Sequence, residues 1–274
     1  MSDDGCNRTR GRPVAGRGKK GKGRSARVSG RNVSTRVHTA KGRKTSSTRW
    51  LQRQLNDPYV AEAKKLGYRS RAAFKLVELD DQFRFLKPGR QVVDLGAAPG
   101  GWTQVAVARC NADAANTDPV GKVVSLDILA MEPIAGATLI EHDFLVDTAP
   151  EQLVEALSGP ADVVLSDMAA PATGHRATDH LRIMALLETA LNFTYQILAP
   201  GGAFVGKVLQ GGTETDLLTV MKQNFHTVRH AKPPASRDGS EILEQILVST
   251  FENDQVLCFP IISGSNRIRS ITFF

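Results

Sequence analysis

The feature that most constrains this fold is the alternation of short apolar runs with amphipathic stretches from residue 91 to residue 249. Gln91–Leu95 and Ala161–Leu165 have the length and the β-branched composition of buried strands. Residues 180–198 instead place apolar side chains at helical spacing. We therefore expect an α/β fold with a doubly wound, mostly parallel sheet, which binds its ligands at the carboxyl ends of the strands.

Helices are expected before this sheet. Trp50–Leu66 has a helical pattern that Gly67 interrupts. Ser70 is placed to act as the N-cap of a second helix, Arg71–Phe85, which carries Lys75.

The positive charge of the chain is concentrated at its N-terminus. Residues 1–49 contain 15 Lys and Arg but only Asp3 and Asp4, whereas the net charge of the whole chain is +7. Residues 1–47 have almost no large apolar side chains, which predicts a disordered tail. We expect this tail to bind nucleic acid through phosphate contacts, and the alternative is a solvated extension that aids solubility.

Cysteine usage and hydropathy favour a cytoplasmic protein. Cys6, Cys110 and Cys258 are too far apart for a zinc motif or a disulfide framework, so we expect reduced thiols and no metal. No apolar run is long enough to span a bilayer, so no membrane contact is expected. An organelle transit peptide would also be rich in Arg and Ser, but the Gly-Lys-Arg run lacks its amphipathic pattern.

A glycine-rich turn, Gly96-Ala-Ala-Pro-Gly100-Gly-Trp102, follows the strand that contains Asp94. It matches neither the dinucleotide pattern nor the triphosphate pattern. A carboxylate would repel a pyrophosphate, whereas it suits the amino group or the sulfonium of S-adenosylmethionine. We therefore predict that Asp94 belongs to a site for S-adenosylmethionine.

Two more acids follow later strands of the predicted sheet. Asp127 is placed to accept hydrogen bonds from ribose hydroxyls, and Asp143 from the adenine amine. The alternative is that each acid is a helix N-cap. Trp102 either packs on the cofactor or attaches its helix to the sheet.

Two lysines stand in unexpected places. Lys207 lies in an apolar strand, where lysine is rarely buried without a partner, and the alternative is an edge strand facing water. Lys75 lies on a mixed helix face, and alone it would be an exposed helix residue. Asp167 follows a buried strand, and Glu241 follows a polar loop.

Over about residues 46–245 the chain resembles the FtsJ-like ribose methyltransferases, because seven separated motifs occur in order. The motifs are Ser46-Ser-Thr-Arg-Trp50-Leu-Gln, Asp57-Pro-Tyr-Val60, Gly67-Tyr-Arg-Ser-Arg-Ala-Ala-Phe-Lys75-Leu, Val93-Asp-Leu-Gly-Ala-Ala-Pro-Gly-Gly-Trp102, Ser166-Asp-Met168, Gly206-Lys-Val208 with Gln210-Gly211, and Lys232-Pro with Ser236-Arg237 and Ser240-Glu241. The resemblance implies a Rossmann-like, seven-stranded sheet and in-line methyl transfer without a metal. It also implies a catalytic tetrad of Lys75, Asp167, Lys207 and Glu241, and cofactor contacts from Gly100, Trp102, Asp127, Asp143 and Asp167.

The opening motif favours the bacterial branch of this family, which methylates a uridine ribose of 23S ribosomal RNA. The predicted organisation is a basic RNA-binding tail (1–47), a methyltransferase domain (48–250) and an atypical C-terminal extension (251–274). The predicted partner is the RNA of the large ribosomal subunit, and the protein is expected to act as a monomer. Leu243 replaces an aromatic residue of the family, and Glu244 competes with Glu241 as the fourth tetrad member.

The predicted chemistry is removal of a proton from a ribose hydroxyl around the moment of attack. Burial and the charge of Lys75 favour the neutral form of Lys207 that could accept this proton, whereas Asp167 and Glu241 favour the charged form. Lys207 is thus either a general base or a group that orients the hydroxyl. Two other functions stay open, a transfer-RNA ribose methyltransferase and a non-catalytic ribosome-assembly factor.

Overall fold

A computed structural model of the chain describes residues 37, 42, 44–114, 119–209, 214–236 and 244–251. All of them belong to one compact unit, Asn32–Phe274, and the other unit, Met1–Arg31, lies outside the described residues. Most of the predicted tail and nearly all of the predicted C-terminal extension are therefore outside them as well. Helix α1 (Thr45–Leu55) begins at Thr45, so the last residues of the predicted tail are helical.

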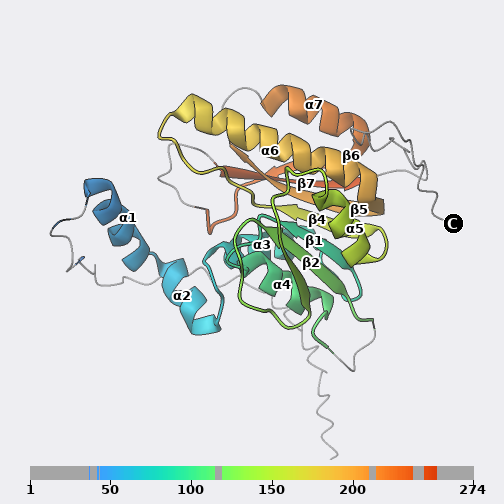
Figure 1. Ribbon diagram of the computed structural model, residues 1–274, viewed down its shortest axis with the longest axis horizontal. Coiled ribbons are helices and arrows are strands. Elements are labelled where there is room, and N and C mark those ends of the chain that lie inside the picture. Colours follow the sequence, from blue (N-terminus) through green and yellow to red (C-terminus); the bar gives the residue numbers. More distant parts are fainter. Residues whose placement is uncertain are drawn as a thin grey trace, which may run out of the picture. The chain divides into compact units, whose positions relative to one another are not determined.

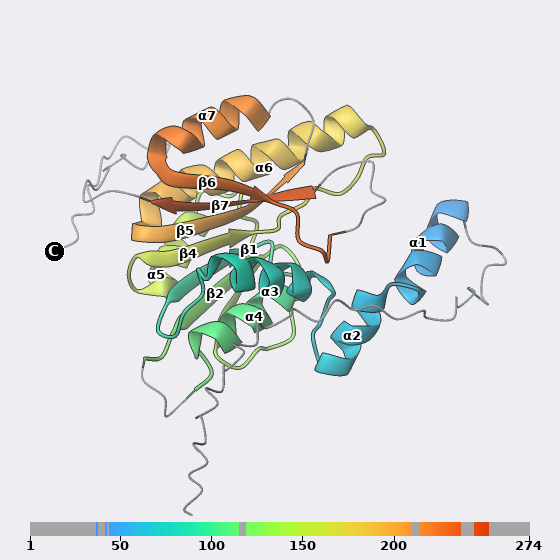
Figure 2. The ribbon, with the colours of Figure 1, turned by 180° about the vertical axis from the view of Figure 1, so that it is seen from behind.

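The centre of the fold is a mostly parallel sheet. Its strands are β1 (Gln91–Leu95), β2 (Lys122–Asp127), β3 (Ala137–Glu141), β4 (Ala161–Ser166), β5 (Leu198–Leu209), β6 (Phe225–Ala231) and β7 (Glu244–Phe251). They are hydrogen-bonded in the order β3-β2-β1-β4-β5-β7-β6. Figures 1 and 2 show the sheet from opposite sides. The pairs from β3 to β5 are parallel, and β7 runs antiparallel to both β5 and β6. The prediction of an α/β fold with a mostly parallel sheet is confirmed.

Helices cover both faces of this sheet. The helices after α1 are α2 (Pro58–Leu66), α3 (Ala72–Phe83), α4 (Gly101–Cys110), α5 (Ala149–Leu157), α6 (Arg176–Ile197) and α7 (Glu214–Asn224). One face carries α5, α6 and α7, and the opposite face carries α3 and α4 (Figures 1 and 2). None of the helices in the described part of the chain is both long and apolar enough to cross a bilayer.

The alternation of side chains along β5 decides which face Lys207 occupies. Phe204 and Val208 belong to the core beneath α5–α7, whereas Ala203 and Val205 belong to the core beneath α3 and α4. Because successive side chains of a strand point to opposite faces, Lys207 lies on the α3–α4 side. This is also the side of the helix that carries Lys75.

Two predictions about the helices before the sheet are wrong. The pattern Trp50–Leu66 is two helices, because Pro58 starts α2 and Asp57 caps it by accepting a 3.0 Å hydrogen bond from the Tyr59 amide. Ser70 is not the N-cap of α3, which begins at Ala72 with Arg71 as the preceding residue. The hydroxyl of Ser70 instead lies against Gly101, in the space that a side chain there would fill.

Candidate active site

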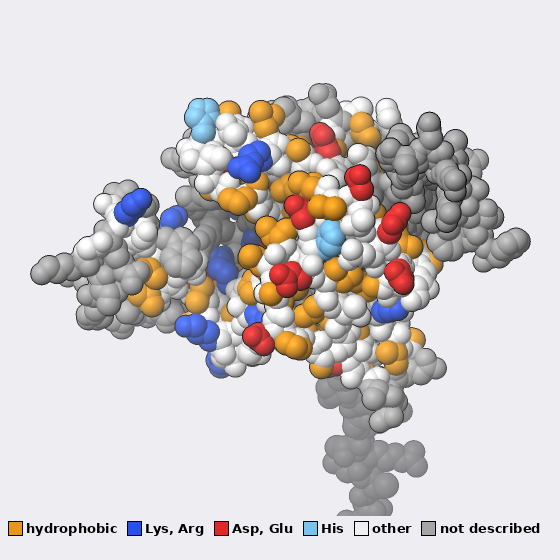
Figure 3. All heavy atoms as spheres, in the orientation of Figure 1, with side chains coloured by type: hydrophobic (Ala, Val, Ile, Leu, Met, Phe, Trp, Pro, Cys, Tyr) orange, Lys and Arg blue, Asp and Glu red, His pale blue; other side chains and the backbone are white. Residues whose placement is uncertain are grey.

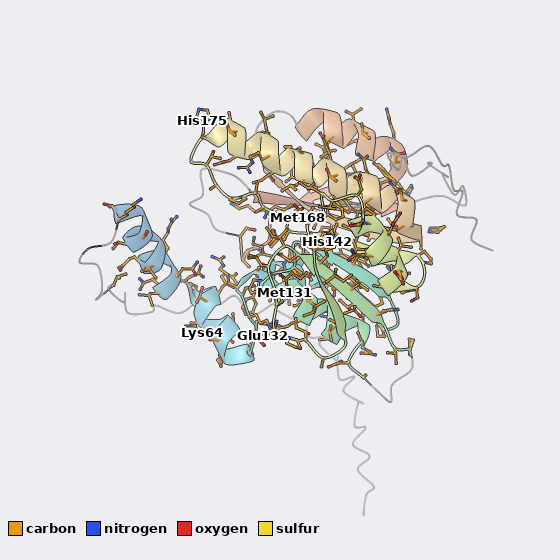
Figure 4. All side chains as sticks on the ribbon, in the orientation of Figure 1. Lys64, Met131, Glu132, His142, Met168 and His175 are labelled. Carbon is orange, nitrogen blue, oxygen red and sulfur yellow. The ribbon has the colours of Figure 1, made fainter. Side chains whose placement is uncertain are left out.

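The glycine-rich turn folds over the carboxyl end of β2. The Gly96 amide donates to the carbonyl of Leu126 at 2.9 Å, and the Ala98 amide donates to Oδ2 of Asp127 at 2.8 Å. Gly96 has φ +72°, and an added Cβ would lie 2.8 Å from Cα of Met168, which follows β4 and is labelled in Figure 4. Only glycine fits this close approach, so the turn, the end of β2 and the segment after β4 meet at one edge of the sheet.

Asp94 is completely buried on β1, beneath this turn. Its Oδ2 accepts a 2.7 Å hydrogen bond from the Thr103 hydroxyl, while its Oδ1 has no partner among the described residues. Burial raises the pKa of Asp94 to about 7, and the charges of Asp167 and Asp127 act in the same direction against the Thr103 hydrogen bond. A buried carboxylate oxygen without a donor suits a cationic or N–H-bearing ligand.

Asp127 is the last residue of β2 and Asp143 follows β3, at the same edge of the sheet. Asp127 is nearly buried, and besides Ala98 its other oxygen accepts from the Leu129 amide at 2.9 Å. Asp143 is exposed and accepts from the Leu145 amide at 2.9 Å. The helix-cap alternative is wrong for these acids, Asp94, Asp127, Asp143 and Asp167, because other residues occupy the N-cap positions of the helices that follow. These are Gly100 for α4, Thr148 for α5 and His175 for α6.

Trp102 is buried and attaches α4 to α3, because its indole N–H donates to the carbonyl of Ala72 at 2.8 Å. Arg69, which the sequence did not single out, braces the turn from outside. Its guanidinium donates to the carbonyls of Pro99 at 3.3 Å and Glu132 at 2.7 Å. Glu132 lies on the loop after β2 (labelled in Figure 4), so Arg69 ties the glycine-rich turn to that loop. The only sequence signal for this role of Arg69 is the pair of arginines, Arg69 and Arg71, on either side of Ser70.

Lys207 and Asp167 form the centre of the candidate catalytic site. Nζ of Lys207 lies 2.8 Å from Oδ1 of Asp167 and also donates to its backbone carbonyl at 2.8 Å. The side chains are only 10% and 20% exposed, so solvent screens the pair weakly. Because β5 pairs with β4 on one side and β7 on the other, the edge-strand alternative for Lys207 is wrong.

Lys75 reaches the same site from α3. Burial raises the pKa of Asp167, but the charges of Lys207 and Lys75, with the Lys207 hydrogen bond, outweigh it and hold that pKa below its usual value. Three of the four predicted catalytic residues therefore converge, although they are far apart in the chain. The fourth, Glu241, lies outside the described residues. Within the described ranges, no group of His, Cys, Asp and Glu is arranged to hold a metal ion.

A family model described as FtsJ-like methyltransferase matches residues 68–248. The chain belongs to the FtsJ-like methyltransferase family. The match spans every predicted catalytic and cofactor residue of this FtsJ-like methyltransferase, and it confirms the family resemblance.

Individual relatives of this FtsJ-like methyltransferase are also similar. It is 65% identical over 210 residues to a Paramagnetospirillum magneticum protein named ribosomal RNA large subunit methyltransferase E, covering 77% of this chain and 85% of that protein. A Rhodospirillum rubrum protein of the same name is 64% identical over 216 residues, covering 79% and 81% of the two chains. The solved structure of a Plasmodium falciparum protein described as a ribosomal RNA methyltransferase is 31% identical with a TM-score of 0.59, covering 68% of this chain and 98% of that one.

Proposed function

We propose that this chain methylates the ribose 2′-hydroxyl of a uridine in 23S ribosomal RNA, with S-adenosylmethionine as the methyl donor. The observation that carries the proposal is the convergence of Lys207 and Lys75 on Asp167 beside the glycine-rich turn. Family membership supports a methyltransferase. The names of the relatives that share about two thirds of their aligned residues with this chain support ribosomal RNA as the substrate.

The residues at the edge of the sheet fit S-adenosylmethionine, which supplies a methyl group on a cationic sulfur. Asp94 offers the unpartnered buried oxygen, and we assign it with Gly100 to the methionine part of the cofactor. Asp127 is assigned to the ribose and Asp143 to the adenine. Ile128, which is 61% exposed beside Asp127, offers an apolar surface for the purine ring. Trp102 supports this site through α4 and Ala72 rather than by an exposed ring face.

The catalytic residues then act on the substrate hydroxyl. Asp167 fixes the ammonium of Lys207 through two contacts, so the amine has one direction in which to meet the ribose. Lys207 either orients the hydroxyl as an ammonium or, in its neutral form, accepts the hydroxyl proton, and Lys75 with Glu241 positions the ribose. Placing the nucleophile in line with the methyl group supplies much of the rate, because it removes the entropic cost of alignment.

Surface charge supports an RNA substrate. Lys64 and Lys65 are exposed in the last turn of α2, and the N-terminal tail adds further positive charge. Figure 3 shows acidic side chains gathered on the face that carries α5, with Lys and Arg toward α2. We propose that RNA approaches from the basic side and that residues 1–47 add affinity that falls with salt.

The finer features of the assignment belong to the same proposal. They are the Rossmann-like seven-stranded form of the fold, a methyltransferase domain at 48–250, the large ribosomal subunit as the assembly that carries the RNA, action as a monomer, and a cytoplasmic location. The strand order supports the first of these.

The direct test is methyl transfer from labelled S-adenosylmethionine to large ribosomal subunits from cells that lack this gene, with bulk transfer RNA in parallel. We expect label in 23S RNA at one uridine ribose, mapped by resistance of the 2′-O-methylated position to alkaline hydrolysis. Label in transfer RNA alone would replace the ribosomal substrate, and RNA binding without label would replace the enzyme with an assembly factor.

A further inference from the structure

Two charged side chains, one on α3 and one on the residue just before it, hold the backbone of one distant residue. The Arg71 guanidinium donates to the carbonyl of Ala235, and the Ala235 amide donates to Oε2 of Glu78 at 2.7 Å. Arg71, Lys75 and Glu78 are spaced by four and three residues, so they share one face of the helix. The segment after β6 is therefore bound to the same face that presents Lys75.

The bound peptide is enclosed. Ala235 is 0% exposed and Ser236 is 4% exposed, although both follow a strand end where a surface loop would be ordinary. A buried backbone N–H and C=O must find partners, and here charged side chains provide them in place of a neighbouring strand. Removing either partner leaves a buried polar group unsatisfied.

A second layer of contacts fixes the two holding side chains. The Tyr59 hydroxyl donates to Oε1 of Glu78 at 3.2 Å, and the Arg71 guanidinium lies 5.5 Å from the centre of the Tyr59 ring. Arg71 also forms an ion pair with Asp57, whose side chain is only 9% exposed. Burial, the first of several causes, raises the pKa of Glu78. Holding a half-buried carboxylate here therefore costs free energy of desolvation. Attachment of a loop does not by itself require a charged side chain.

The two holding residues lie about 10 Å apart along the helix axis, one turn before and one turn after Lys75. Contacts on both sides of a residue restrain sliding and rotation of the helix at that residue. The ammonium of Lys75 is close enough to Asp167 to lower the pKa of that carboxyl, so a shift of α3 changes the catalytic site directly.

We infer that Arg71 and Glu78 are positioning residues for methyl transfer, which hold Lys75 in place by binding the backbone N–H and C=O of Ala235. This inference rests on the proposed function. It predicts a fall in the rate of the chemical step with little change in cofactor binding, because Asp94, Asp127 and Asp143 lie on other elements.

The test compares Glu78→Ala with Glu78→Gln in the full-length protein. Glutamine keeps an oxygen that can accept from the Ala235 amide, and its NH₂ group can donate to the Tyr59 hydroxyl. We expect Glu78→Ala to lower kcat about 100-fold on large ribosomal subunits, the loss typical of a small misplacement, with the Kd for S-adenosylmethionine unchanged. Glu78→Gln should keep most of kcat, because the hydrogen bond rather than the charge holds the peptide.

Arg71→Lys tests the same inference independently. A single ammonium cannot reproduce the planar fork that serves Asp57 and Ala235 together, so kcat should fall here as well. The matched control is Asp81→Ala, which removes a 52% exposed carboxylate from the same helix without touching Ala235. It should leave kcat unchanged. Melting temperatures identify any variant that does not fold at the assay temperature.

Every outcome of these measurements either supports or overturns the inference. The inference is overturned if folded Glu78→Ala keeps wild-type kcat, if Glu78→Gln is as impaired as Glu78→Ala, or if the loss appears in the Kd for S-adenosylmethionine. If Glu78→Ala does not fold, the inference stands only when Arg71→Lys loses kcat while Glu78→Gln retains it. Failure of the wild-type protein to methylate either RNA is the separate failure of the proposed function.

Discussion

Replacing Lys207 with methionine tests the centre of the site. Methionine keeps the length and apolar character of the side chain but removes the cation 2.8 Å from Oδ1 of Asp167. It also removes the donor to the Asp167 carbonyl, which Lys207 contacts at 2.8 Å. The Asp167 carboxylate then remains in a largely buried place with Lys75 as its nearby cation.

The loss of stability expected for Lys207→Met follows from this geometry. Breaking a buried ion pair on one side costs about 3 to 5 kcal/mol. The 20% exposure of Asp167 and the charge of Lys75 place this case at the lower end, so we expect a loss of about 3 kcal/mol in the free energy of unfolding at pH 7.5.

The penalty must depend on pH in one direction. In the wild-type protein the folded pKa of Asp167 is depressed, so the pair contributes stability above the unfolded pKa of about 4 and loses it as pH falls through the folded pKa. In the variant, burial is opposed only by Lys75, so the pKa of Asp167 rises and protonation relieves the unpaired charge. The difference between the two proteins should therefore be smaller near pH 5 than at pH 7.5.

Urea denaturation at both pH values measures this difference. Lys65→Met is the matched control, because its ammonium is 74% exposed and should contribute under about 1 kcal/mol at either pH. Calorimetry should show unchanged S-adenosylmethionine binding while methyl transfer is lost. An equal loss in the free energy of unfolding at both pH values would refute the electrostatic reasoning. Loss of cofactor binding would show that Lys207 belongs to the cofactor site and not to the catalytic site.

Three further predictions follow from other parts of the molecule. Because burial raises the pKa of Asp94 to about 7, S-adenosylmethionine should bind more tightly as pH rises from 6 to 8, and Asp94→Asn should abolish this pH dependence. If calorimetry finds the same pH dependence of the Kd in both proteins, Asp94 does not contact the cofactor. Gly96→Ala should lower the free energy of unfolding by about 2 to 4 kcal/mol in urea, because the residue has φ +72° and its Cβ would lie 2.7 Å from Cγ of Met168. Deleting residues 1–43 should weaken RNA binding and flatten its salt dependence without changing cofactor affinity, and an unchanged salt slope would reduce the tail to a solubility device.

The order of strands and helices was predictable because it depends on local patterns. The runs Gln91–Leu95 and Ala161–Leu165 lie in strands of the structure, as their composition indicated. The prediction is less accurate for the helical region Trp50–Leu66 before these strands. Asp57 and Pro58 carry a clear start signal for α2, but the helical pattern of Trp50–Leu66 continues across them and predicts one helix.

The candidate site was predictable only in part. Lys75, Asp167 and Lys207 were recognised through the family motifs, and no local pattern could have shown that they converge. Arg69 was missed because its role depends on carbonyl groups about 30 and 63 residues away. Backbone partners of this kind leave no trace in composition or spacing.

By itself, the sequence determined the α/β class, the glycine-rich turn beside a carboxylate and the family, because spacing and residue type express those directly. Only the tertiary structure decided that Lys207 lies on an inner strand facing α3, that Asp94 is buried with one oxygen unpartnered among the described residues, and that α3 binds the backbone of Ala235. The physical reason is that burial and ionic contacts are properties of atoms brought together from distant parts of the chain. A side chain acquires its charge state and its direction only after the strands and helices have packed.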